Sequence, residues 1–270
     1  MNAHAATVEK IKERVGHRLP KVAIVLGSGL QAVAGDVMEA VTFAYAELPG
    51  FPKTSVASHR GRLVIGKMQG HSVAVMQGRG HYYEYGKPDI MRAPLEVLAA
   101  LGCTQFVLTA AAQSVKPELG PGQLVLVEDH INFAGTNPLI GQLGDNRFVN
   151  MGAAYDPLLR ERVRAAAERL GIPLPGGIFT WFAGPSSETP AEIRAARALG
   201  GDMVGKSLVP EVILARFLGL RVVALANVTD WAVGAGPADA NPNLTQQRAD
   251  FGAIHLRQIL AEYLGHGGAD

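Results

Sequence analysis

Several short segments carry side chains that could bind a small anion, and most of them follow apolar runs. Gly27-Ser28-Gly29 follows the run from 22 to 26, and Gln77 to His81 follows the run that ends at Met76. Glycines let the backbone approach an anion, while serine hydroxyls and the arginine fork donate hydrogen bonds to phosphate oxygens. A plain strand-to-helix turn explains the first segment equally well, and a solvated basic turn is the alternative for the second. The basic segment 58–62 is as consistent with a surface cluster as with a site.

Two carboxylates stand in comparable places later in the chain. Glu188 comes just ahead of a predicted helix, and Asp230 follows the last apolar run. Each could accept a hydrogen bond from a ligand N–H; the alternatives are a charge favoured by the helix dipole for Glu188 and a helix cap for Asp230. Lys206 and Ser207 lie at another predicted strand-to-helix junction. Together these groups predict an anion site beside a site for a heterocycle that carries N–H groups.

Strands and helices alternate along the chain and would position these groups. Apolar runs predict strands at 22–26, 62–65, 72–76, 106–108, 124–127, 178–182 and 221–225. Helical spacing and end signals predict helices at 8–15, 88–101, 157–170, 190–199 and 211–217, and a last helix that buries Leu256, Ile259, Leu260 and Tyr263. Thr189 and Glu192 predict a capping box at the start of one helix. This alternation predicts an α/β domain with a mostly parallel or mixed sheet, with ligands beyond the carboxyl ends of its strands.

The composition excludes several classes of protein. The 270 residues carry a formal net charge of +1, which argues against a general nucleic-acid binder, and 48% are hydrophobic, which argues against disorder. We find no apolar run near the ~18 residues that span a bilayer and no secretory signal, and the single cysteine, Cys103, allows no internal disulfide. We therefore expect a cytoplasmic protein without membrane or nucleic-acid partners. Only 18% of residues are charged, which hints at surface hidden in an oligomer.

The order of these segments resembles the trimeric purine nucleoside phosphorylase family, which includes the methylthioadenosine phosphorylases. The matching segments are Val25–Leu30, Leu48–Pro52, Gln77–Glu84, Asp129–Asn132, Asn137–Gly141, Ala154–Asp156, Gly184–Ser186, Glu188–Arg194 and Val209–Ile213. They run in family order over nearly the whole chain. The resemblance implies one nucleoside phosphorylase domain over residues 1–270, an α/β domain with a central mixed, partly barrel-like β-sheet flanked by helices.

The family cleaves the N-glycosidic bond of a purine nucleoside with inorganic phosphate, giving the free base and a pentose 1-phosphate. The resemblance implies phosphate as co-substrate, no cofactor, no metal and a homotrimer in which Phe148 reaches the neighbouring subunit's site. The implied phosphate ligands are Ser28, His59, Arg79, His81, Ala111 and Ser207. The implied ribose contacts are Tyr83, Lys206, Gln246 and Phe148, and the implied base contacts are Ala112, Gln113, Phe179, Ser187, Glu188 and Asp230. The implied catalytic residues are His81, Glu188 and Asp230.

The chain departs from the family pattern within the expected nucleoside pocket. Ala110 and Gln113 replace an asparagine and a glycine, and Ser187, Lys206, Asp230 and Gln246 replace phenylalanine, methionine, asparagine and histidine. Ionised Asp230 suits a 6-amino group, whereas Glu188 suits the N1–H of a 6-oxopurine, so the base preference stays open. The Lys206 amine would either strengthen phosphate binding or oppose the positive charge that develops on the sugar.

Three functions follow from this pattern. The leading one is a purine nucleoside phosphorylase with an altered base and ribose pocket. The second is a 6-aminopurine or 5′-methylthioadenosine phosphorylase, favoured by Asp230 and the changed 5′ side of the pocket. The third is a catalytically silent nucleoside-binding homologue, supported only by the changes at Ala110 and Gln113.

Overall fold

The apolar runs form the strands of one sheet, and the amphipathic segments form the helices around it. The strands are β1 (Val22–Val25), β2 (Met38–Ala44), β3 (Arg62–Met68), β4 (His71–Gln77), β5 (Gln105–Ser114), β6 (Leu124–Asn132), β7 (Gly176–Trp181), β8 (Met203–Gly205) and β9 (Arg221–Trp231). The helices are α1 (Ala5–Val15), α2 (Tyr82–Tyr85), α3 (Arg92–Ala100), α4 (Pro157–Arg169), α5 (Pro190–Ala198), α6 (Val209–Phe217) and α7 (Pro242–Gly265). Short 3-10 helices span Gln31–Asp36, Tyr45–Glu47 and Asp145–Arg147.

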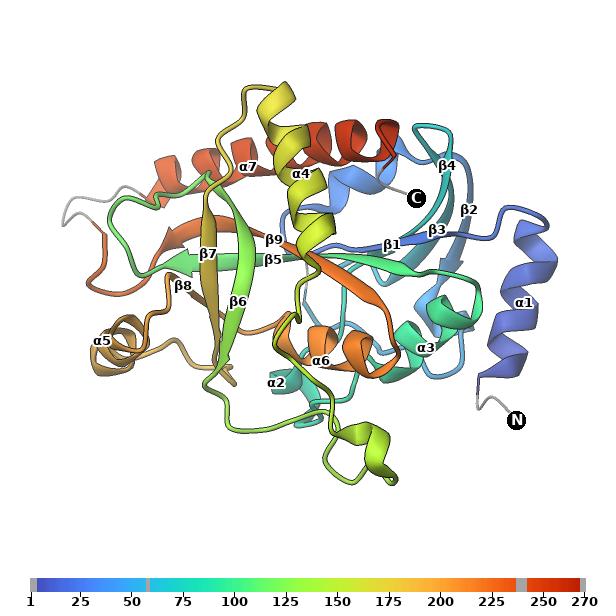
Figure 1. Ribbon diagram of the computed structural model, residues 1–270, viewed down its shortest axis with the longest axis horizontal. Helices are drawn as coiled ribbons and strands as arrows, with labels where there is room; N and C mark the ends of the chain where they lie inside the picture. Colours follow the sequence, from blue (N-terminus) through green and yellow to red (C-terminus); the bar gives the residue numbers. More distant parts are fainter. Residues whose placement is uncertain (1–3, 57–58, 237–241, 268–270) are drawn as a thin grey trace.

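The computed structural model in Figure 1 describes residues 4–56, 59–236 and 242–267, excepting the side chains of residues 242–249. The sheet has nine strands in the order β2-β3-β4-β1-β5-β8-β7-β6-β9, and β9 also pairs with β5. That additional pairing closes the last five strands into a barrel. Parallel pairs such as β1–β5 and antiparallel pairs such as β3–β4 occur together, so the sheet is mixed. The predicted fold class is therefore confirmed.

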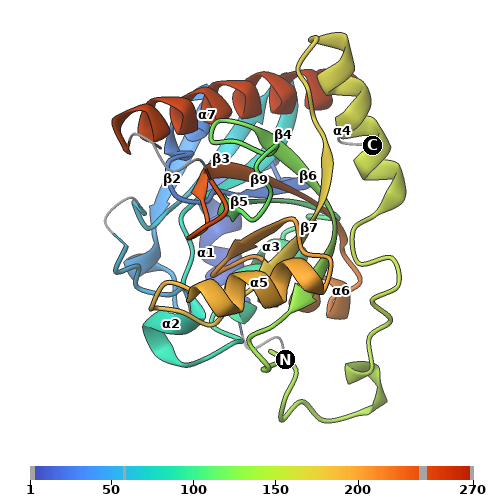
Figure 2. The ribbon, with the colours of Figure 1, turned by 90° about the vertical axis from the view of Figure 1, so that its left-hand side faces the viewer.

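Helices cover both faces of the sheet, which explains the unbroken apolar runs. α4 and α7 lie over one face, while α2, α3 and α6 lie on the opposite side in both views (Figures 1 and 2). Every residue of β1 is buried, as expected for a strand enclosed on both faces. The four predicted core residues of α7 are buried against β9 and α4.

Most element predictions are confirmed, with corrections at the boundaries. The capping box is present, because Thr189 N donates to Glu192 Oε2 over 2.7 Å and Glu192 N donates to Thr189 Oγ1 over 3.2 Å. The helix predicted at 88–101 begins only at Arg92, since turns occupy the preceding residues. β5, β6 and β9 extend beyond the predicted runs. β8 was expected only as a strand of undefined extent ahead of Lys206, and β2 and α2 were not predicted at all.

Candidate active site

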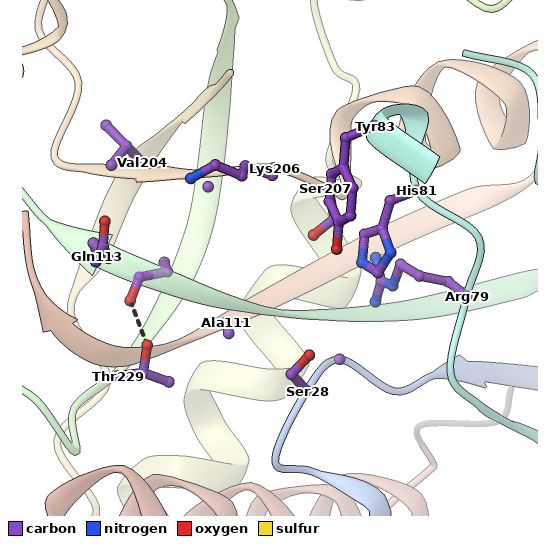
Figure 3. A pocket seen from close by; sticks show the side chains of 13 residues that line it. Ser28, Arg79, His81, Tyr83, Ala111, Gln113, Val204, Lys206, Ser207 and Thr229 are labelled. Atoms are coloured by element: carbon purple, nitrogen blue, oxygen red, sulfur yellow. Dashed lines mark hydrogen bonds between the residues drawn. The ribbon is translucent and has the colours of Figure 1, made fainter. Parts of the chain in front are cut away.

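A cavity of about 190 Å³ lies where several strands end, and it gathers most of the predicted site residues. Its described lining comprises Gly27, Ser28, Arg79, His81, Tyr83, Ala111, Ala112, Gln113, Val204, Gly205, Lys206, Ser207 and Thr229. These residues follow β1 and β4, lie in or just after β8, belong to the ends of β5 and β9, or, for Tyr83, lie in α2 (Figure 3). The expectation that the motifs meet at the carboxyl ends of the strands is confirmed.

Two glycines allow the backbone to pack closely around this cavity. A Cβ at Gly27 would lie 3.0 Å from Ala110 Cα, so the end of β1 can touch β5 only with glycine there. Gly78 has φ +114°, and a Cβ there would lie 2.6 Å from His59 Cβ. A side chain at position 78 would therefore be strained and would displace His59.

Arg79 is fully buried and most of its guanidinium is already engaged by the protein. Its Nη1 donates to Glu211 Oε1 over 2.9 Å, and its Nη2 donates to the carbonyl oxygens of Val25 and Thr109. Nε is buried and has no hydrogen-bond partner among the described residues. Glu211 and the two carbonyls fix the plane of the guanidinium and balance its charge, leaving donors for a ligand.

His59 connects the backbone of Arg79 to Ser28. The His59 Nδ1 lies 3.1 Å from Arg79 O and accepts from Arg79 N over 3.3 Å in the tautomer that leaves Nδ1 unprotonated. Its Nε2 lies 3.3 Å from Ser28 Oγ. Burial, with help from the charge of Arg79, lowers the pKa of His59 to about 4, so the ring is neutral at pH 7. In the tautomer with the proton on Nε2, the Ser28 hydroxyl accepts from His59 and keeps its own proton for a ligand.

His81 is held by Glu84, one turn of chain further on. Glu84 Oε1 accepts from His81 N over 2.8 Å and lies 2.7 Å from His81 Nδ1, which places the proton on Nδ1. Burial is the main cause that lowers the pKa of His81, and it outweighs the hydrogen bond to Glu84. His81 is therefore neutral at pH 7, and Nε2 is an acceptor for a ligand proton. The ring is stacked between His59 and Tyr83, with ring centroids 5.1 and 4.7 Å away.

Lys206 connects the cavity to the expected base carboxylate. Its Nζ lies 2.9 Å from Glu188 Oε1, forming an ion pair in which the Glu188 side chain is only 3% exposed. Glu188 itself lines an adjoining cavity with Ser187, Phe133 and Phe182. The predicted base contacts therefore lie in two adjoining spaces, with the Lys206–Glu188 pair between them.

The other predicted residues whose side chains the structure describes lie outside the lining of the main cavity. Phe179 is fully buried behind Gly205, where a Cβ on the glycine would lie 2.5 Å from Phe179 Cζ. Asp230 caps no helix: it lies in β9, and its Oδ1 accepts from Trp231 N over 2.8 Å. Phe148 is 75% exposed on the loop that precedes α4. Ala110 is buried on the opposite side of β5, and the side chain of Gln246, in α7, lies outside the described residues.

Sequence reasoning missed four groups that shape the cavity: Glu84, Glu211, Val204 and Thr229. Glu84 could have been found from its position three residues after His81, which is the spacing of a capping box at the start of a helical turn. Glu211 pairs with Arg79, which lies 132 positions away in the sequence, so no local sequence pattern predicts this contact. Thr229 takes the place in the lining that was expected for Asp230, because β9 is irregular where it pairs with Gln113.

Comparison with known proteins identifies the family. The model of the phosphorylase superfamily matches residues 21–265. Purine nucleoside phosphorylase 1 of Geobacillus stearothermophilus is 42% identical over 219 residues, covering 80% of each chain. The chain belongs to the purine nucleoside phosphorylase family. The resemblance inferred from the motifs is thus confirmed.

Two further relatives extend this finding to mammals and to solved structures. The purine nucleoside phosphorylase of Mus musculus is 40% identical, over 79% of this chain and 77% of its own. The crystal structure of isoform 2 of the Schistosoma mansoni purine nucleoside phosphorylase, in complex with cytosine and ribose-1-phosphate, has a TM-score of 0.87. It is 31% identical and covers 97% of this chain and 95% of that chain. The family's fold is therefore retained over almost the entire chain.

None of the helices among the described residues combines the length and the apolar character that a membrane-spanning helix requires. Within the same residues, no group of three or more histidine, cysteine, aspartate or glutamate side chains is placed to hold a metal ion.

Proposed function

We propose that this protein is a purine nucleoside phosphorylase, which uses inorganic phosphate to release the base and form a pentose 1-phosphate. The observation that carries the proposal is the convergence of Ser28, Arg79, His81 and Ser207 on one cavity. Ser207 lies two residues ahead of α6, whose helix dipole favours an anion nearby. Relatives about 40% identical over most of the chain carry this name, which supports the same activity here.

The geometry supports a mechanism in which phosphate binds as the hydrogen phosphate dianion and is oriented for attack. Hydroxyl and guanidinium donors would hold the unprotonated phosphate oxygens, and the neutral His81 Nε2 would accept a hydrogen bond from the remaining P–OH group. The phosphate dianion then stabilises the positive charge that develops on the sugar and forms the new C–O bond as the C–N bond breaks. The leaving base gains negative charge, which donors at the other end of the cavity stabilise.

The experiment is to incubate the protein with inosine, guanosine, adenosine or 5′-methylthioadenosine, with and without phosphate. We expect base release and pentose 1-phosphate formation only when phosphate is present. The variant K67M, which removes an exposed lysine paired with Glu39 at 3.0 Å, should retain wild-type activity and serves as the control. Purine binding without turnover of any nucleoside would contradict the proposal and favour a silent binding homologue.

We propose further that the protein is a homotrimer in the cytoplasm and needs no bound cofactor. The trimer is supported by three strongly exposed apolar side chains on the loop 137–148: Ile140 at 75%, Leu143 at 81% and Phe148 at 75%. Apolar side chains gathered on one loop favour a protein contact over solvent.

A further inference from the structure

The ion pair between Lys206 and Glu188 places a charged hydrogen-bond donor beside a charged acceptor at one end of the cavity. Lysine only donates hydrogen bonds, and an ionised carboxylate only accepts them. Glu188 is 3% exposed and its Oε1 lies 2.9 Å from the Lys206 ammonium, whereas Lys206 remains 24% exposed along the cavity. The buried carboxylate is therefore balanced by the ammonium, and the ammonium keeps further N–H groups for a ligand.

The Lys206 side chain points away from the phosphate-binding end of the cavity. Figure 3 shows its amine on the side of Val204 and Gln113, with Ser28, Arg79 and His81 at the opposite side. The stem of Lys206 packs on Gly184, where a Cβ would lie 2.7 Å from Lys206 Cδ. This packing and the ion pair together hold the amine toward Glu188 and away from the site expected for phosphate.

We propose that Lys206 is a specificity-determining residue for the base. With Glu188 it forms a donor beside an acceptor, and this pair selects purines that carry an acceptor at C6 next to an N1–H group. The 6-oxopurines have this edge: Lys206 donates to O6 and Glu188 accepts from N1–H. The inference rests on the proposed phosphorolysis, because it names the substrate class of that same site.

Charge favours the same assignment. When a 6-oxopurine leaves the sugar, the electron pair of the C–N bond moves into the base, and part of the negative charge reaches O6. An ammonium at O6 is attracted to that charge, so its hydrogen bond is stronger in the transition state than in the bound substrate. Purine without a C6 substituent has no O6 for Lys206, and its N1 is only an acceptor, so it cannot donate to Glu188.

The test compares wild type with K206M on inosine and on purine riboside, which lacks the C6 oxygen. We expect K206M to lower the ratio of kcat/KM for inosine over purine riboside by roughly tenfold to a hundredfold, as for a lost hydrogen bond to a charged group. The phosphate KM should change less than twofold.

The double variant K206M/E188Q should lower the same kcat/KM ratio by much less than the product of the two single-variant effects, since the residues act as a unit. K67M is the matched control and should leave the ratio unchanged.

Two results would overturn the inference. If K206M lowers kcat/KM for both nucleosides by the same factor, Lys206 merely neutralises Glu188. If K206M instead raises the phosphate KM tenfold with the ratio intact, Lys206 serves the phosphate. Equilibrium binding of hypoxanthine and of unsubstituted purine separates this inference from the proposed function. Hypoxanthine preference that is lost in K206M would support the role of Lys206 even if wild type turns over no nucleoside, whereas equal binding of the two bases would refute it.

Discussion

His59 is a neutral histidine buried beside the guanidinium of Arg79, and its burial lowers the stability of the folded protein at acidic pH. Burial first, then the charges of Arg79 and His81, lower its pKa from 6.5 to about 4. The unfolded chain binds a proton at this residue near pH 6.5, whereas the folded chain does so only near pH 4. Folding is therefore progressively disfavoured as the pH falls between these two values, and the effect is complete below pH 4.

We expect H59Q to lose part of this acid sensitivity. The wild-type free energy of unfolding should fall from pH 6.5 to pH 4 by on the order of 1–2 kcal/mol more than that of H59Q, a figure reduced for solvent screening. Urea denaturation at a series of pH values measures both curves. They should run parallel above pH 7, where His59 is neutral in the folded and unfolded chain alike. Parallel curves down to pH 4 would show that His59 titrates normally.

At this scale the sequence predicted which residues meet at the cavity better than it predicted their partners. Ser28, Arg79, His81 and Ser207 line one cavity, as their positions beside apolar runs lead one to expect. The pairing of Lys206 with Glu188 was not predicted, because it depends on which way a long flexible side chain turns. The sequence left open whether the amine faces phosphate or sugar, and the structure directs it to the carboxylate instead.

The buried ion pair of Arg79 and Glu211 joins the segment after β4 to helix α6. Both side chains are nearly inaccessible, at 1% and 3% exposed, and the two atoms that meet lie 2.9 Å apart. Each of these two buried charges has lost its hydration and is stabilised by the opposite charge. Removing one of them therefore leaves the other without a compensating partner. Glu211 thus fixes both the arginine and the position of α6 relative to the cavity.

We expect E211Q to lower the free energy of unfolding by about 3–5 kcal/mol and to raise the phosphate KM. The matched control is E39Q, which breaks an exposed pair with Lys67 and should cost less than about 1 kcal/mol. Chemical denaturation and phosphate titrations of activity give the two values. Equal stability losses in E211Q and E39Q would mean that the buried pair contributes no more than a surface one.

Elements enclosed on both faces were predictable, and edge or short elements were not. β1 is a continuous apolar run because helices cover both of its sides. β2 lies at the edge of the sheet and most of its side chains are exposed, so no apolar pattern marks it. β5 continues through Ala110, Ala111 and Ala112, residues with little strand preference that are held extended by β9. β8 has only three residues, too few for any periodicity.

At the scale of the whole molecule, the loop 137–148 exposes apolar side chains that would remain in contact with water in a monomer. Phe148 stands on this loop with Arg147, whose guanidinium lies 4.9 Å from the ring centroid. The family resemblance implies that this phenylalanine completes the site of a neighbouring subunit, whereas His81 serves the site of its own subunit. An active site would then be built from two chains, and a lone subunit would lack one wall of its nucleoside pocket.

Mixing two inactive variants tests this arrangement. F148A removes the side chain supplied to the neighbour, and we expect the nucleoside KM to rise at least several-fold with little change in the phosphate KM. H81A should be nearly inactive because it lacks the hydrogen-bond acceptor for the phosphate P–OH group. When the two are unfolded together and refolded as mixed oligomers, an F148A subunit beside an H81A subunit has its own His81 and receives Phe148 from the neighbour. We therefore expect the mixed oligomers to be more active than the sum of the separately refolded variants. We also expect the wild-type protein to have a mass in solution of three times 28.5 kDa. A monomer with wild-type activity, or mixed samples no more active than the separate ones, would show that each chain builds its site alone.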